Sequence, residues 1–321
     1  MNIPIVTKTK NENIQFLRGI AILAVVIIHS SMPDVLRVVI RPFVNYAVAL
    51  FIFLSGYLTN IDISDKKNFM KKRIIKVIVP YMIWSIIFSV PSKFEHFGLN
   101  LLTGRCCGIY YYIFVYVQFV ILTPLISRLI KSQYAWIGWL ITPISTLIFR
   151  YIFKYMGLTV LSANFNYFFF AWFIYYYMGL YMGNDIFKPI KKEYMYWLLY
   201  LFSIILSITE GFIWYKAGDF DLATTQLRLT SIITSSIFIT ICYFYIRNGN
   251  TQNAISKFFV RVGNYSFGIY LSHILIISIF ERTIANTNIF PINAIIVLLV
   301  TAGLCYCGKK ILKKYSWIFG L

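Results

Sequence analysis

The chain has 321 residues, of which 59% are hydrophobic and 13% are charged, and its mean hydropathy is +0.72. This composition leaves too little polar surface for a soluble globule and indicates a polytopic membrane protein. The formal net charge of +19 does not indicate nucleic-acid binding, because Lys and Arg occur in short clusters between apolar segments. The five cysteines show neither CxxC spacing nor a His partner at metal-ligand spacing, so no metal site is expected.

Ten apolar segments of roughly membrane-spanning length follow one another along the chain. Their approximate cores are 14–32, 42–60, 73–91, 109–130, 134–153, 165–183, 194–215, 229–247, 265–281 and 289–308. Because the connections are short, we expect one all-α transmembrane domain over 1–321, with about ten helices and no fused extracytoplasmic domain. No small-residue cleavage site follows the first apolar segment, so we expect it to be a retained helix and not a signal peptide.

Lys and Arg fall unevenly on the two sides that alternate along such a chain, with about 19 on one side and about 9 on the other. The richer side holds Lys8, Lys10, Lys66, Lys67, Lys71, Lys72, Arg73, Arg128, Lys131, Lys188, Lys191, Lys192, Arg247, Lys257, Arg261, Lys309, Lys310, Lys313 and Lys314. Loops rich in Lys and Arg remain in the cytoplasm, so both termini are predicted to be cytoplasmic.

The first segment contains Arg18 and His29, separated by ten apolar or small residues. On a helix, eleven steps of about 100° make close to three turns, so both side chains share one stripe roughly 16 Å long. An ionisable side chain at the membrane centre costs about 2.5–3.5 kcal/mol and usually faces a protein interior or a cavity. The predicted orientation puts Arg18 near the cytoplasm and His29 in the outer half, so this stripe predicts a functional site.

A basic cluster begins the third segment, at the same membrane face as Arg18. Taken alone, Lys71 and Lys72 are ordinary positive-inside anchors, whereas Lys76 lies inside the apolar segment, one turn beyond Arg73. A pocket of Arg18, Arg73 and Lys76 would attract a multiply anionic ligand.

Two further ionisable residues lie at membrane depth. Glu210 in the seventh segment has a depth similar to that of His29, so it could orient the imidazole or accept a sugar hydroxyl. His273 lies near the middle of the ninth segment, where it is either a catalytic group or a neutral, hydrogen-bonded structural histidine.

Other polar residues leave two interpretations open. Ser55, Gly56 and Tyr57 end the second segment, where small residues favour close helix packing or a break that lines a site. Gln118 in the fourth segment is predicted either to bond across helices or to meet a polar ligand.

In this order the motifs resemble a known family, the bacterial integral-membrane O-acyltransferases of acyltransferase family 3. The resemblance covers nearly the whole chain. It rests first on Arg18-x10-His29, on F-I-F-L-S-G-Y at 51–57, and on the third segment with Arg73, Lys76 and Pro80. Two further motifs support it, Y-Y-I-F-V-Y-V-Q-F-V-I-L-T-P-L at 111–125 and S-F-G-I-Y-L-S-H at 266–273. The middle of the chain, including F-I-Y-Y-Y-M-G-L-Y-M-G at 173–183, is most similar to the staphylococcal intercellular adhesion protein C type.

The resemblance implies a multi-pass protein of the bacterial plasma membrane that uses an acyl-CoA donor, with acetyl-CoA expected. The donor phosphates would bind at the Arg18, Arg73 and Lys76 cluster, and the pantetheine arm matches the roughly 16 Å to His29. His29 would act as general base on a hydroxyl of a surface polysaccharide or lipid-linked glycan, with Glu210 or His273 completing the catalytic end.

The sequence leaves two other functions open and departs from the family pattern at two points. The same helices could export a polysaccharide such as poly-N-acetylglucosamine, or serve as a structural partner of a glycan synthase. The family typically has Arg where this chain has Lys76, which retains the charge but loses the bidentate fork. Some members carry a fused extracytoplasmic esterase-like domain, so here a second transfer step would need a separate extracytoplasmic partner.

Overall fold

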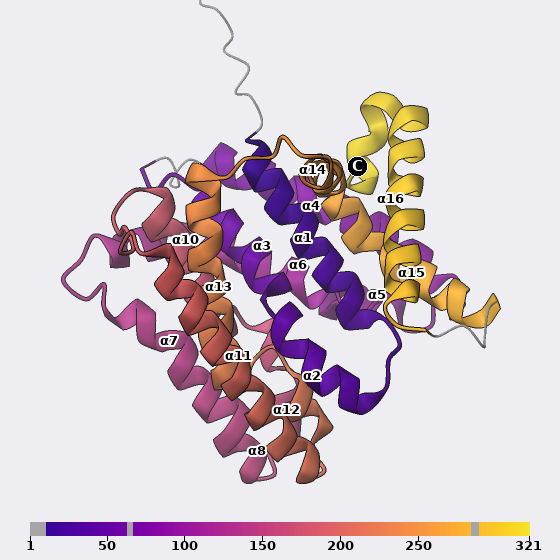
Figure 1. Cartoon of the computed structure of the whole chain (residues 1–321). Helices are drawn as coiled ribbons and strands as arrows, with labels where there is room; N and C mark the ends of the chain where they lie inside the picture. The colour runs from indigo at the N-terminus through magenta and orange to yellow at the C-terminus, as the bar shows by residue number, and fades with distance from the viewer. Residues whose placement is uncertain (1–10, 63–66, 284–288) are drawn as a thin grey trace, which may run out of the picture.

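The computed structural model describes residues 11–62, 67–283 and 289–321, and all regular elements in these ranges are helical (Figure 1). The first half of the chain forms α1 (Glu12–His29), α2 (Asp34–Val44), α3 (Tyr46–Tyr57), α4 (Lys67–Ser89), α5 (Phe97–Thr103), α6 (Tyr111–Ile130), α7 (Ile137–Thr146), η1 (Leu147–Ile152), α8 (Phe153–Tyr155) and α9 (Thr159–Ala163). The second half forms η2 (Phe165–Tyr167), η3 (Phe169–Ala171), α10 (Phe173–Gly183), α11 (Glu193–Lys216), α12 (Phe220–Thr224), α13 (Leu229–Asn248), α14 (Ala254–Asn264), α15 (Ser266–Thr283), α16 (Ile292–Leu312) and η4 (Lys313–Phe319). Lys8, Lys10 and Lys66, which contributed to the predicted orientation, lie outside the described residues.

Within the described ranges, six stretches are long and apolar enough to cross a membrane. They are Glu12–His29, Asp34–Tyr57, Tyr111–Ile130, Glu193–Lys216, Phe220–Asn248 and Ile292–Phe319. A seventh forms if α14 and α15, which bend by 81° at their junction, are counted as one span. The all-helical transmembrane class predicted from the sequence is confirmed, whereas the count of ten and the sides of the termini stay predictions.

Two predicted segments are interrupted in the structure. The segment 165–183 begins with the 3-10 turns η2 and η3, which leaves α10 with 11 residues. At 1.5 Å per residue, α10 is roughly 16 Å long, about half of the hydrocarbon thickness. The segment 134–153 changes from α7 to the π-helix η1 before it ends. An apolar composition therefore does not ensure a continuous helix.

The position of α1 is fixed by a close crossing with α14. A Cβ on Gly19 of α1 would overlap the backbone carbonyl of Phe259, and a Cβ on Gly263 of α14 would overlap that of Gln15. Glycine lets two helices approach until their backbones touch, as small residues commonly do in membranes. On its other side α1 packs against α3, which in turn packs closely on α10. The helix that carries Arg18 and His29 is therefore held from both sides.

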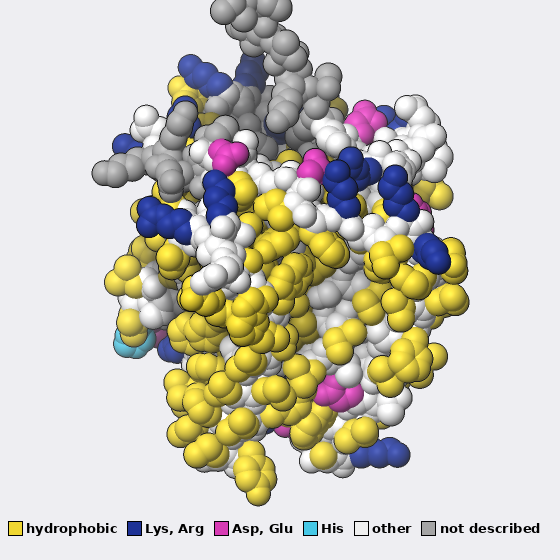
Figure 2. Space-filling model, turned by 90° about the vertical axis from the view of Figure 1, so that its left-hand side faces the viewer, with side chains coloured by type: hydrophobic (Ala, Val, Ile, Leu, Met, Phe, Trp, Pro, Cys, Tyr) yellow, Lys and Arg dark blue, Asp and Glu magenta, His cyan; other side chains and the backbone are white. Residues whose placement is uncertain are grey.

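The surface separates into an apolar body and a basic end. Figure 2 shows a broad hydrophobic region and a band of Lys and Arg above it, at the end where α1 begins. The same end contains the C-terminus of α13, because Asn13 Nδ2 donates to the carbonyls of Ile246 and Gly249 at 3.2 and 3.0 Å. This distribution agrees with the charge asymmetry on which the predicted orientation rests.

We predict that Gly263→Ala destabilises the protein, because the new methyl group meets backbone atoms that cannot move aside as a flexible side chain would. Overpacking of this kind costs roughly 1–3 kcal/mol, so the thermal unfolding midpoint in detergent should fall. The matched control is Gly303→Ala on α16, where a Cβ meets nothing within 4 Å. An unchanged midpoint in Gly263→Ala would mean that this crossing does not determine the position of α1.

Candidate functional site

Arg18 and Arg73 meet in one cavity of about 210 Å³ between α1, α3, α4, α6 and α15. Its lining consists of Arg18, Val25, Val48, Phe51, Ser55, Leu58, Arg73, Val77, Tyr112, Tyr116, Ser266, Phe267 and Tyr270. None of these lining residues is acidic, so the cavity has two positive charges on an otherwise aromatic and aliphatic wall. Such a site favours a ligand that is anionic at one end and apolar along its length.

The two arginines differ in how the protein holds them. Arg73 donates from Nη1 to Thr59 Oγ1 at 2.5 Å and from Nη2 to the Ser55 carbonyl at 3.3 Å, and its guanidinium lies 5.0 Å from the Phe69 ring. Arg18 makes no hydrogen bond or ion pair with any described residue. Arg73 is therefore already oriented, while the donors of Arg18 remain available to a ligand.

Ser55 lies within α3 and lines the cavity, and its predicted role toward substrate stays a prediction. Its carbonyl accepts from Arg73, and its Oγ is buried in the cavity wall without a hydrogen-bond partner. The next residue, Gly56, touches the backbone of α10, which is the close packing expected from small residues. Tyr57 turns toward Tyr243, with 6.4 Å between the ring centroids, and does not line the cavity.

Two other predicted site residues have different surroundings. Lys76 is exposed and is not part of the cavity lining. Gln118 bridges α6 to the η2 and η3 turns, because its Nε2 donates to the Tyr167 carbonyl at 2.8 Å and its Oε1 accepts from Phe169 N at 2.9 Å. It therefore bonds across elements, as one of its two interpretations predicted.

His29 and His273 lie next to each other, 5.5 Å apart between ring centroids. His29 ends α1 with an exposed side chain that makes no hydrogen bond to any described residue. His273 on α15 is 0% exposed, and its Nδ1 lies 3.1 and 2.9 Å from the carbonyls of Ile269 and Tyr270. Since carbonyls only accept, Nδ1 carries the proton, which leaves the partnerless Nε2 with a free lone pair.

The cavity ends close to this histidine pair. Val25 and Tyr270 line its inner end, and they lie four residues before His29 on α1 and three before His273 on α15. One helical turn therefore separates the cavity from the two imidazoles. The stripe predicted from the Arg18 and His29 spacing runs along this wall.

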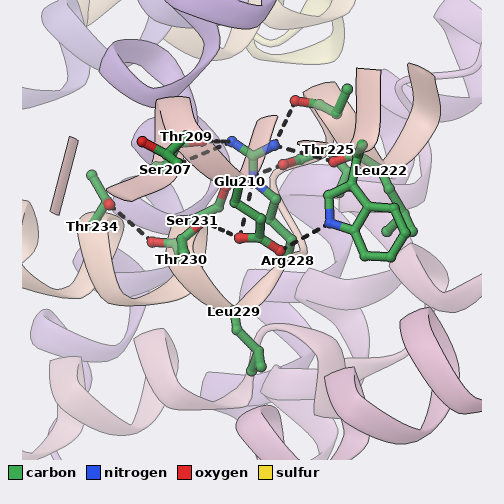
Figure 3. A network of polar contacts seen from close by, with 12 residues as sticks. Ser207, Thr209, Glu210, Leu222, Thr225, Arg228, Leu229, Thr230, Ser231 and Thr234 are labelled. Atoms are coloured by element: carbon green, nitrogen blue, oxygen red, sulfur yellow. Dashed lines mark hydrogen bonds and ion pairs between the residues drawn. The ribbon is translucent and has the colours of Figure 1, made fainter. Parts of the chain in front are cut away.

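Glu210 belongs to a separate polar network between α11, α12 and α13 (Figure 3). Its Oε1 accepts from Tyr151 Oη at 2.7 Å and from Trp214 Nε1 at 3.2 Å, and its Oε2 accepts from Thr230 and lies 3.6 Å from Arg228 Nε. None of its described contacts is with His29. The structure thus gives both carboxylate oxygens other partners, and the catalytic role stays a prediction.

Arg228 is the residue that sequence reasoning missed in this network. It is 0% exposed, and it donates to the carbonyls of Leu222, Ala223 and Ser207 at 3.2, 2.5 and 2.6 Å, and to Ser207 Oγ at 3.0 Å. The sequence contains one signal for this residue, a lone Arg at the start of the apolar segment 229–247, which looks the same as an ordinary loop charge.

Comparison with known proteins places the chain in a family. The acyltransferase family 3 model, described as an acyltransferase domain, matches residues 11–309, and the chain belongs to this family. Relatives in Staphylococcus aureus strains MSSA476 and MRSA252 are 27% and 26% identical over 306 residues, covering 88% of this chain and 83% of theirs. Both are named probable poly-beta-1,6-N-acetyl-D-glucosamine export protein. No solved structure matches.

The family and the apolar helices together identify a multi-pass bacterial membrane protein. The family resemblance found in the sequence, including its staphylococcal branch, is therefore confirmed.

We predict that Glu210→Gln lowers stability, because it removes the charge that faces the buried Arg228. A buried polar group that loses its partner costs roughly 1–3 kcal/mol, measurable as a lower unfolding midpoint. Glu281→Gln, at an exposed position near the end of α15, is the control and should leave the midpoint unchanged. Normal stability of Glu210→Gln would contradict the structural role and favour a role in catalysis.

Proposed function

We propose that the chain is an O-acyltransferase that moves an acyl group, acetyl or succinyl, from cytoplasmic acyl-CoA to a hydroxyl of a surface polysaccharide. One observation carries this proposal: Arg18 and Arg73 line a single cavity that stops one turn short of His29. The cavity has a basic site at one end and a free imidazole beyond its other end. This arrangement suits a long donor molecule that carries phosphates at one end and a thioester at the opposite end. Membership of the acyltransferase family supports the reaction class.

The donor would enter from the basic end of the bundle. Arg18 and Arg73 would bind its phosphates, and the exposed Lys76 would attract it over a longer range without a fixed contact. A volume of about 210 Å³ is too small for a whole acyl-CoA, so the cavity would hold the pantetheine arm while the nucleotide stays outside. The unpaired Ser55 Oγ offers that arm a hydrogen-bond partner.

The chemical step needs one base. Neutral His29 would take the proton of the acceptor hydroxyl, whose oxygen forms a bond to the thioester carbon. The carbon–sulfur bond breaks, and the leaving thiolate takes the proton back from the His29 imidazolium, which releases CoA.

His273 would orient His29 in place of a carboxylate. Its Nδ1 proton is directed at two backbone carbonyls, so its Nε2 can only accept a hydrogen bond. If that bond comes from an N–H of His29, the other ring nitrogen of His29 carries the lone pair that the reaction needs. This makes His273 a positioning residue in the proposal.

Export of a polysaccharide is the second candidate function, because the Staphylococcus aureus relatives carry export in their names. An exporter needs a passage wide enough for sugar units and no anion site next to a free imidazole. The acceptor glycan, a glycan synthase or a separate extracytoplasmic protein would be the partners under either proposal. The two functions differ in whether the chain binds CoA.

We predict that CoA at millimolar concentration raises the unfolding midpoint of the purified protein, because a ligand that binds only the folded state stabilises it. Arg18→Gln should weaken CoA binding about 10- to 100-fold, since a charge-assisted contact contributes roughly 1.5–3 kcal/mol. The Arg18 side chain makes no hydrogen bond or ion pair with a described residue, so this change should spare the fold. Lys76→Gln should weaken binding less than tenfold. No stabilisation by CoA in the wild type would favour export.

We predict that His29→Ala lowers acyl transfer by about 100- to 10,000-fold, the range that a general base contributes. The assay uses membrane vesicles with labelled acyl-CoA and surface glycan, and follows label in the glycan. Stabilisation by CoA should persist, because His29 lies beyond the donor cavity.

The matched control is His96→Asn, which changes an exposed histidine with a left-handed backbone that Asn tolerates. Wild-type transfer by His29→Ala would rule out the assignment of His29 as base.

A further inference from the structure

Two arginines on α2 lack an acidic partner. Arg37 and Arg41 are four residues apart and therefore share one face of the helix. Arg37 donates weakly to the Met32 carbonyl at 3.4 Å and lies 5.6 Å from the centre of the Phe220 ring. The Arg41 side chain makes no hydrogen bond or ion pair with any described residue. The Nε atoms of both side chains are buried without a partner.

The surroundings of Arg41 do not balance its charge. Its charged neighbours are Arg37, Arg228 and Asp221. Asp221 is already bound by Arg150, with 2.7 Å between the charged atoms, and by Lys154 at 3.7 Å. Asp34, three residues before Arg37 on α2, forms no ion pair with either arginine. Two like charges on a membrane-embedded helix are costly unless something else supplies negative charge.

Arg41 lies near His29, one member of the histidine pair. It interacts electrostatically with His29, and α2 follows α1 at the end opposite to that of Arg18 (Figure 1). The hydroxyl of Tyr111 on α6 also interacts with Arg41 and lies beside Gln226, whose Oε1 is buried without a hydrogen-bond partner. Free donors and a free acceptor thus gather around Arg41, which in turn lies near His29.

We infer that Arg37 and Arg41 form a binding site for an oxyanion, a phosphate or a carboxylate, carried by the sugar acceptor. Guanidinium forks bind both groups well, and the oxyanion supplies the charge that the protein leaves out. The free Gln226 Oε1 would accept from a hydroxyl of the same sugar. That this ligand is the acceptor rests on the proposed function, whereas the binding of an oxyanion does not.

We predict that sodium pyrophosphate or sodium glucuronate raises the unfolding midpoint of the full-length protein in detergent. The measurement is made in the Arg18→Gln background, which weakens anion binding at the donor cavity. Adding Arg41→Gln should abolish the shift, and adding Arg282→Gln, which changes an exposed arginine near the end of α15, should not. N-acetylglucosamine at matched ionic strength is the uncharged control and should give a smaller shift.

Comparing the midpoint shifts given by pyrophosphate and glucuronate distinguishes a phosphate from a carboxylate as the group that the site binds. A larger shift with pyrophosphate supports a phosphorylated acceptor, and a larger shift with glucuronate supports an acidic sugar. Since the Arg41 side chain makes no hydrogen bond or ion pair with a described residue, Arg41→Gln alone should unfold at the wild-type midpoint or above it. If it does not fold, Arg37→Gln replaces it.

Absence of an anion shift, or a shift that survives Arg41→Gln, overturns the site. Neither result depends on CoA. Failure of the proposed transferase would appear separately, as missing stabilisation by CoA or as transfer that does not need His29.

Discussion

The cost of placing a guanidinium inside a membrane bundle organises this protein. Each embedded arginine must find acceptors in the protein or obtain them from a ligand. The Arg228 side chain donates to three carbonyls and a hydroxyl, and its Nε lies 3.6 Å from Glu210. Arg73 has two acceptors, while Arg18 and Arg41 have none among the described residues. This series separates Arg228, whose side chain the protein holds, from Arg18 and Arg41, whose side chains have no acceptor among the described residues.

The same argument explains why α1 must be held rigidly. Arg18 and His29 can serve one ligand only if their roughly 16 Å spacing and common stripe are kept. The crossing at Gly19 and Gly263 fixes α1 against α14, next to Arg18, and α3 supports its other side. At the far end, α15 brings His273 to within 5.5 Å of His29. The glycines therefore contribute to function through helix position, although they touch no ligand.

Sequence reasoning identified some of the residues that come together and missed others. Charge and helical spacing were sufficient to predict that Arg18 and Arg73 converge, and similar depths were sufficient to suggest His273 near His29. Depth also suggested Glu210, yet that carboxylate is bound by Arg228, because depth does not say which way a side chain points around the helix axis. Arg41 was missed because a basic residue near a predicted helix end is indistinguishable from a topology signal until its neighbours are known.

Two basic sites on opposite sides of one imidazole bear on the choice between transfer and export. A transporter carries one ligand past its sites, so the sites along its path should recognise the same chemical group. Here the cavity at Arg18 is aromatic and narrow, whereas the Arg41 side offers polar groups such as Gln226 and Tyr111. Such unlike sites suit two different substrates that meet at His29. A reaction in which a donor and an acceptor approach from opposite ends requires this arrangement, and the passage of a single polysaccharide does not.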